Sequence, residues 1–150
     1  PRSDAFVLGV VTIITVLEDL AVAVIAGIII SALVFAWEHA KIFARTSTDS
    51  EGKKIYELDG PLFFASVTSF NEQFDVENDP SDVIIDFKKA RVMDSSGAEA
   101  IDSLTDKYKK SGKKLTLRHL SEDCKGMLKT AGPFCSYEED DPTYKVAANV

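Results

Sequence analysis

The tetrapeptide Asp94-Ser95-Ser96-Gly97 is the part of the sequence whose residue types are best suited to chemistry. It lies between an apolar, β-branched run and a segment of helical periodicity, so it is expected at a strand-to-helix junction. A helix N-terminus offers unpaired backbone N–H groups and a positive partial charge, which together favour anions. Two interpretations follow. The four residues form a partner- or anion-facing loop with Ser95 as a candidate regulatory phosphorylation site, or Asp94 or a serine merely caps the helix.

Other motifs of catalysis or ligand binding are missing from the sequence. It contains no GxxxxGK[ST] or GxGxxG phosphate loop and no HExxH or CxxC metal motif. Cys124 and Cys135 are eleven positions apart, and His39 and His119 fall in different segments, so a metal site is not expected. We interpret His119 as an ordinary strand-end residue and Cys124 as a packed helix residue. The sequence therefore predicts no catalytic residues, no cofactor, no metal and no enzyme activity.

Alternating strands and helices are needed to position the tetrapeptide. Strands are predicted at residues 55–58, 83–87 and 114–119, with a last edge strand at 134–137, and helices at 67–74, at 98–108 and after the N-cap Ser121. The run 83–87 lacks strong alternation, which is typical of a strand buried on both faces. The predicted core consists of apolar residues from all these elements: Phe64, Phe70, Val83, Ile85, Phe87, Ile101, Leu104, Leu117 and Leu128. The fold class is α/β, with a small mixed sheet of about four to five strands flanked by helices.

The overall composition limits the classes of partner. The chain has 150 residues and a net charge of −7, most of it after residue 45. An acidic chain does not neutralise a row of phosphates, so no nucleic-acid partner is expected. Two cysteines are too few for a disulfide framework and are typical of a reducing compartment.

Two charge-free apolar runs, residues 5–17 and 20–37, stand apart from this acidic part. A signal peptide fits poorly, because the second run ends in Trp37-Glu38-His39 rather than in small residues. A buried helix in a soluble protein also fits poorly, because the second run lacks a polar stripe. We therefore predict two membrane helices, with Lys41 and Arg45 on the cytoplasmic flank.

These patterns divide the chain into three parts. Residues 1–45 are predicted to be the terminal membrane helices of a larger membrane domain, residues 46–54 a polar linker, and residues 55–150 a cytoplasmic α/β domain.

Three stretches resemble a known family. The string from Asp94 to Ala100 looks like the signature of STAS domains (sulphate transporter and anti-sigma factor antagonist). Residues 55–65 and 119–124 resemble the STAS region of bacterial SulP anion transporters, and residues 2–44 resemble their last two membrane helices. The resemblance covers roughly residues 3–147.

The resemblance implies a function and a location. SulP proteins are secondary anion transporters that carry sulphate, bicarbonate or dicarboxylates and are commonly dimeric. By analogy, this chain is the cytoplasmic regulatory domain and membrane tail of an inner-membrane transporter. Its expected partners are the membrane, the rest of the membrane domain, a cytoplasmic protein and a second copy.

A second function class remains open. In soluble anti-sigma factor antagonists the serine directly after the Asp is phosphorylated, and Ser95 is the matching residue here. The chain would then be a soluble phospho-switch. The apolar runs distinguish the two classes, because a soluble switch has no use for them.

Overall fold

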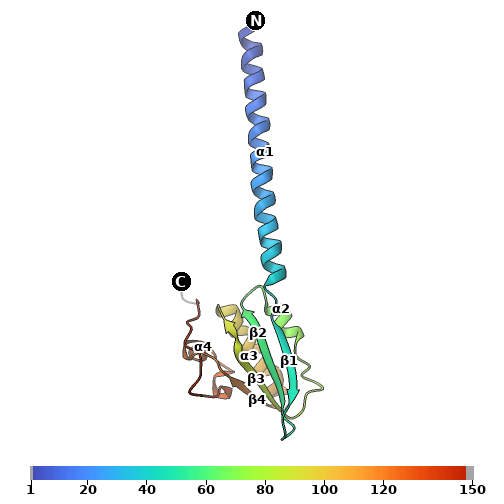
Figure 1. Cartoon of the computed structure of the whole chain (residues 1–150), viewed down its shortest axis with the longest axis vertical. Helices are drawn as coiled ribbons and strands as arrows, with labels where there is room; N and C mark the ends of the chain where they lie inside the picture. The colour runs from blue at the N-terminus through green and yellow to red at the C-terminus, as the bar shows by residue number, and fades with distance from the viewer. Residues whose placement is uncertain (1, 148–150) are drawn as a thin grey trace. The chain divides into compact units, whose positions relative to one another are not determined.

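A computed structural model describes residues 2–147, which fall into two compact units, Pro1–His39 and Ala40–Val150 (Figure 1). The first unit is a single helix, and the second is an α/β domain. The elements are α1 (Arg2–His39), β1 (Phe43–Thr48), β2 (Lys54–Leu62), α2 (Val67–Glu72), β3 (Asp82–Val92), α3 (Ser95–Lys110), β4 (Lys114–Arg118), α4 (Glu122–Met127) and the 3₁₀ helix η1 (Gly132–Phe134).

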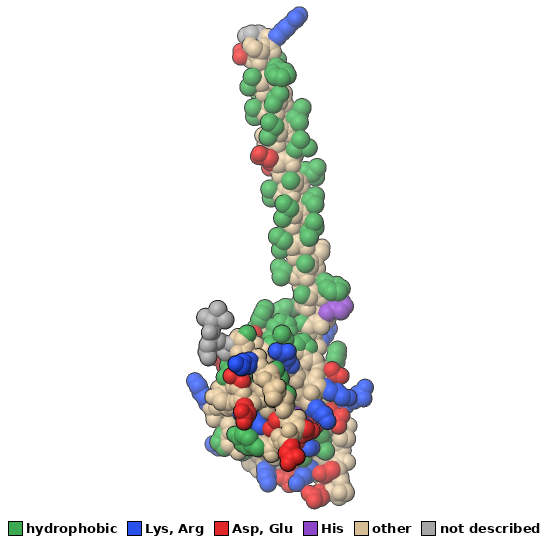
Figure 2. Space-filling view, turned by 60° about the vertical axis from the view of Figure 1, so that its left-hand side comes forward, with side chains coloured by type: hydrophobic (Ala, Val, Ile, Leu, Met, Phe, Trp, Pro, Cys, Tyr) green, Lys and Arg blue, Asp and Glu red, His purple; other side chains and the backbone are tan. Residues whose placement is uncertain are grey.

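Helix α1 is one continuous helix of 38 residues, so the prediction of two separate helices was wrong. Glu18 and Asp19 separate the two apolar runs, but acidic residues are compatible with a helix, and no Pro or Gly lies beside them to break it. None of the residues of α1 is buried, and apolar side chains line most of the visible length of the helix (Figure 2). By length and composition alone, α1 is long and apolar enough to cross a membrane.

The domain is built on one four-stranded sheet with the strand order β1-β2-β3-β4. Strands β1 and β2 form an antiparallel pair, whereas β2, β3 and β4 are parallel to one another. Helices α2 and α3 make the two parallel crossovers. Both crossovers step in the same direction and are right-handed by rule, so both helices cover the same face of the sheet. The predicted small mixed sheet flanked by helices is therefore confirmed.

Strand β3 is buried on one face only, which corrects the prediction for residues 83–87. Val83, Ile85 and Phe87 are buried under the helices, whereas Ile84 and Asp86 on the other face are only half-buried. Because Ile84 on the half-buried face is also apolar, the sequence of this strand shows no clear alternation of apolar and polar residues. In the described chain, the helices thus leave the second face of the sheet largely polar.

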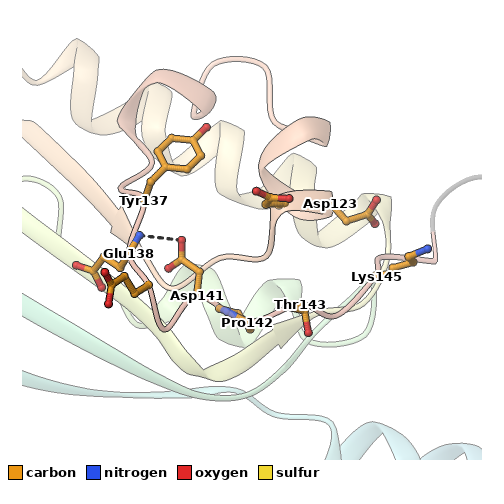
Figure 3. A pocket seen from close by; sticks show the side chains of 9 residues that line it. Asp123, Tyr137, Glu138, Asp141, Pro142, Thr143 and Lys145 are labelled. Carbon is orange, nitrogen blue, oxygen red and sulfur yellow. Dashed lines mark hydrogen bonds between the residues drawn. The ribbon is translucent and has the colours of Figure 1, made fainter.

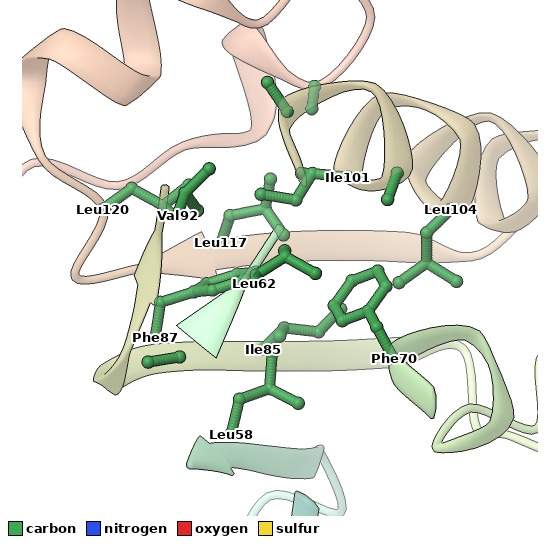
Figure 4. Close-up of a cluster of buried hydrophobic side chains, with 14 of the residues drawn as sticks. Leu58, Leu62, Phe70, Ile85, Phe87, Val92, Ile101, Leu104, Leu117 and Leu120 are labelled. Atoms are coloured by element: carbon green, nitrogen blue, oxygen red, sulfur yellow. The ribbon is translucent and has the colours of Figure 1, made fainter. Parts of the chain in front are cut away.

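The core lies between the sheet and helices α2 to α4 (Figure 4). Every residue of the predicted core is buried except Phe64, which is 66% exposed. Strand β2 ends at Leu62, and a turn follows in which Phe63 donates its N–H to Ser66 Oγ at 3.1 Å. The strand alternation stops there, so Phe64 leaves the core.

Strand β1 occupies residues that were assigned to the membrane segment and to the linker, so both boundaries were misplaced. It is an edge strand on which only Ala44 is even half-buried, and its polar residues concealed it. Side chains of α2 and of its C-cap residue satisfy the outward backbone at the start of β1. Ile42 N–H donates to Ser69 Oγ and Ala44 N–H to Gln73 Oε1, both at 3.1 Å.

The predicted last strand, residues 134–137, is reduced to a single parallel bridge between Leu117 and Cys135. Residues 132–134 form η1 instead, because Pro133 lacks the N–H that a strand ladder requires. The N-cap prediction for Ser121 is confirmed, since its Oγ accepts from Cys124 N–H at 3.2 Å.

Candidate functional site

The tetrapeptide 94–97 joins the end of β3 to the first turn of α3, as predicted. Asp94 Oδ1 accepts from Gly97 N–H at 2.9 Å, which caps α3, and Asp94 Oδ2 accepts from Phe64 N–H at 3.1 Å. One carboxylate therefore fixes the end of β3, the start of α3 and the turn after β2. The cap is supplied by Asp94, which leaves the two serines free of this role.

Gly97 allows α3 to approach the sheet closely. A Cβ atom at this position would lie 2.8 Å from the carbonyl oxygen of Leu62 and 3.1 Å from Val92 Cγ1. Real Cβ atoms do not approach a backbone oxygen that closely, so any larger residue displaces the helix. Gly97 is thus a packing residue that positions the serines.

Ser95 is exposed and Ser96 is half-buried. Within residues 2–147, no hydrogen bond involves either hydroxyl. Ser95 is the first residue of the 16-residue helix α3, where the helix dipole favours a negative group. The position is chemically suited to a phosphoryl group, although the exposed Glu99 lies one turn further along the same helix.

A shallow groove of about 330 Å³ between α2 and α3 begins beside this junction. Its lining residues are Phe64, Val67, Asn71, Ser96, Glu99, Ala100 and Ser103. The groove mixes an exposed aromatic ring with hydroxyl, amide and carboxylate groups, so it is suited to a peptide or protein surface. The partner-facing loop predicted from the sequence therefore borders a concave surface.

His119 is not an ordinary strand-end residue, which corrects the sequence interpretation. Its side chain is only 5% exposed, and its backbone φ is 60°, a rare value for a non-glycine residue. Nδ1 lies 2.7 Å from Asp86, and Nε2 lies 2.8 Å from Glu138 and 3.1 Å from Asp140. Burial opposes the charged ring, but the carboxylates of Asp86 and Asp140 raise the pKa of His119 above its ordinary value.

The carboxylates around His119 have further cationic partners. Arg118 Nε lies 3.1 Å from Glu138, Lys88 Nζ 3.8 Å from Asp140, and Lys125 Nζ 2.5 Å from Asp141. One ligand atom each from His119, Glu138, Asp140 and Asp141 lies within 4.8 Å of the others, which is compatible with a metal ion. Because the acids are already paired with cations, we interpret the cluster as an ionic network that holds residues 138–141 against β4 and α4.

A second hydrogen-bonded centre lies at the opposite end of β3. Asp79 accepts from Tyr108 Oη at 2.5 Å, from Tyr56 Oη at 2.7 Å and from Lys54 Nζ at 2.7 Å. Burial of the carboxyl acts against ionisation, yet these donors lower the pKa of Asp79. This centre is structural, because its donors all come from the domain itself. Both centres escaped the sequence analysis, since their members are far apart in the chain.

A large, open hollow lies between α4 and residues 137–145 (Figure 3). It has a volume of about 880 Å³, and five carboxylates line it: Glu122, Asp123, Glu138, Glu139 and Asp141. Glu138 donates its backbone N–H to Asp141 Oδ2 at 3.1 Å, which shapes the floor. With Lys145 as its one basic lining residue among the described positions, this hollow repels anions.

The sequence matches a known domain family and two bacterial proteins. The STAS domain family model matches residues 44–147. The Bacillus subtilis protein named "Putative sulfate transporter YbaR" is 34% identical over 131 residues, which are 86% of this chain and 27% of that protein. "Putative sulfate transporter YvdB" from the same organism is 26% identical over 144 residues, which are 89% of this chain and 27% of that protein. This chain thus spans about a quarter of the length of these relatives.

One solved structure shows the same fold. The structure described as the overall structure of SLC26A9 matches 79% of this chain and 26% of that chain, with a TM-score of 0.53 and 18% identity. A STAS-domain antisigma-factor antagonist from Rhodobacter sphaeroides covers 51% of this chain and 84% of its own, with a TM-score of 0.47 and 28% identity. The resemblance to the STAS region of SulP-type transporters, drawn from the strings around residues 55, 94 and 119, is therefore confirmed. The chain belongs to the STAS domain family.

Proposed function

We propose that this chain is the membrane tail and cytoplasmic regulatory STAS domain of a SulP-type transporter that moves sulphate or a related anion across the inner membrane. One observation carries the proposal. A fully exposed apolar helix, α1, runs directly into a STAS domain, and both lie in the stretch shared with relatives named as sulfate transporters. A soluble phospho-switch does not account for α1, which is why we prefer the transporter.

The charge distribution supports a cytoplasmic STAS domain. Lys41, Arg45, Lys53 and Lys54 follow α1 closely, whereas Arg2 is the only basic residue before its apolar part. Basic residues are enriched on the cytoplasmic side of membrane helices. If the continuous helix α1 crosses the membrane once, Arg2 lies on the opposite side from these residues.

The membrane assignment is tested with the full chain produced in bacteria. We expect it to sediment with the inner membrane and to resist carbonate extraction. A Ser50→Cys variant, in the exposed turn after β1, should react with a membrane-impermeant maleimide in inverted vesicles and not in intact cells. A full chain that is monodisperse in water without detergent would contradict the proposal.

We assign the proposed regulatory role to Ser95 and the groove beside it. Phosphorylation there adds roughly two negative charges next to the groove, which is enough to alter the docking of a cytoplasmic protein, of the membrane domain or of a second copy. In the full-length transporter we expect Ser95→Asp to change the maximal uptake rate and Ser95→Ala to leave it at the unphosphorylated level. Ser50→Asp adds the same charge at a distant exposed turn and serves as the control. Equal uptake by all three variants would leave Ser95 without a regulatory role.

A further inference from the structure

One end of the sheet in the Ala40–Val150 unit differs from the rest of its surface. In the described part of this unit, four large hydrophobic side chains are exposed, and three of them lie at this end: Phe43 (61%), Phe64 (66%) and Met93 (43%). The fourth, Tyr137, is covered on one side by Lys125, whose Nζ lies 4.0 Å from the ring centroid. In Figure 2, hydrophobic side chains gather at one end of this unit, whereas charged ones cover most of the visible face.

The strand register brings these residues together. Phe43 opens β1 and pairs with Asp59 of β2, and Asp59 pairs with Lys89 of β3. Beyond the strands, Met93 N–H donates to the Leu62 carbonyl at 2.9 Å. The start of β1 and the ends of β2 and β3 therefore share one edge of the domain. Phe64 lies where this edge meets the groove between α2 and α3.

Basic side chains accompany the apolar ones. Lys41, Lys89 and Arg91 are all exposed, and the backbone of Lys41 packs beside Gly60 near the end of β2. Asp59 is the exposed acid among them, and the carboxylate of Asp94 is already used by two N–H groups. This end is thus apolar and basic in a chain whose net charge is −7. We call Phe43, Met93, Lys41, Lys89 and Arg91 the apolar-basic end.

Chain connectivity keeps the first residues of the domain close to the end of α1. Ala40 follows the last residue of α1, and consecutive Cα atoms are about 3.8 Å apart. Residues 40–43 therefore begin within a few residues of the point where a membrane-spanning α1 leaves the bilayer. Exposed aromatic and basic side chains at such a position are the combination that binds the headgroup layer.

We propose that the apolar-basic end lies on the cytoplasmic face of the bilayer, with Phe43 and Met93 in the headgroup layer and Lys41, Lys89 and Arg91 bound to anionic lipid headgroups. This inference rests on the proposed membrane position of α1. Each basic side chain close to an anionic surface strengthens binding about fivefold. The contact holds the STAS domain in one orientation against the membrane.

The test uses the full chain in lipid nanodiscs, labelled one position at a time with bimane. Burial raises the pKa of Cys124 to about 12 and that of Cys135 to about 11, so the native thiols react slowly at neutral pH. Labels are placed by Phe43→Cys and Met93→Cys at the apolar-basic end, by Ile25→Cys in α1, and by Ser50→Cys at the far end of β1. Quenching by phosphatidylcholine brominated near the headgroup, or deep in the acyl chains for position 25, reports contact with lipid, and iodide reports contact with water.

We expect lipid quenching at positions 25, 43 and 93 and iodide quenching at position 50. Mixing phosphatidylglycerol into the nanodisc should increase quenching at 43 and 93. The double variant Lys89→Gln/Arg91→Gln should lose that increase, whereas Lys107→Gln/Lys109→Gln, with the same charge change on α3, should retain it.

The two proposals fail in different ways. Lipid quenching at position 25 with none at 43 and 93 overturns the lipid contact and leaves α1 in the membrane. No lipid quenching at position 25 overturns both. Labels at 43 and 93 that are shielded from lipid and iodide alike show that protein covers this end, which also overturns the inference.

Discussion

Helices α1 and α3 differ in whether their apolar side chains are buried. Helix α3 buries one face against the sheet, through residues such as Ile101 and Leu104, and exposes lysines at its end. Helix α1 is apolar on all sides and buries nothing in the described chain. The comparison shows that α3 is folded by its own domain, whereas α1 needs an apolar solvent or other helices that residues 2–147 do not supply.

The same truncation in the two helices should give the largest contrast. Leu104→Ala removes a buried side chain and is expected to lower the free energy of unfolding of the domain by about 2–5 kcal/mol. Leu33→Ala, in the exposed apolar surface of α1, should leave it unchanged. Denaturant titration of the full chain in mild detergent, followed by tyrosine near-UV circular dichroism, measures both. Equal losses would mean that α1 packs against the domain.

A glycine substitution sharpens the comparison at the backbone. Gly97→Ala forces a Cβ against the Leu62 carbonyl and is expected to cost about 1–3 kcal/mol of domain stability. Gly27→Ala in α1 meets nothing within 4 Å and should be neutral or should slightly favour the helix. Thermal unfolding of both variants in the same detergent gives the result. A neutral Gly97→Ala would mean that α3 does not approach β2 as closely as described.

Loss of the cap of α3 should have a smaller effect. Asp94→Ala removes the acceptor of Gly97 N–H and Phe64 N–H and should destabilise the domain by about 1 kcal/mol. Ser95→Ala, one residue later, should change stability by less than about 0.5 kcal/mol because its hydroxyl caps nothing. The pair separates the structural role of Asp94 from the regulatory role proposed for Ser95. Reversed magnitudes would reassign the cap.

The smallest expected effect depends on pH. Because the carboxylates raise the pKa of His119 in the folded state, its stabilising charge is fully present below the unfolded value of 6.5 and is lost as pH rises through the folded value. Domain stability should therefore fall between mildly acidic and mildly alkaline pH. His119→Gln should flatten this dependence, whereas His39→Gln, at the exposed end of α1, should preserve it. A flat profile in the parent chain would contradict the network.

Local signals in the sequence predicted much of the domain. The caps at Asp94 and Ser121 and the apolar run at 83–87 located a helix start, a second helix start and the central strand, because each depends on neighbouring residues. Strand β1 was missed because its polar residues 46–48 show no alternation. Its antiparallel pairing with β2 holds these residues in an extended strand that the sequence pattern does not indicate. Long-range partners were also missed. Nothing near His119 in the sequence indicates that Asp86 and Glu138 converge on it.

For the candidate site, the sequence located the junction 94–97 but not its surroundings. The clash that makes Gly97 necessary involves Leu62, 35 positions earlier, and the groove beside Ser96 requires two helices to be placed. Both depend on tertiary packing rather than on spacing along the chain. The sequence therefore located the junction, and the fold shows how its four residues are placed.

The outer edge of β1 limits how copies of this domain can associate. With Ser69 and Gln73 occupying the outward N–H groups of residues 42 and 44, a strand from another molecule finds donors only along the remaining half of β1. So short a template does not sustain a sheet that continues between molecules. Association of two copies edge to edge through β1 is therefore disfavoured.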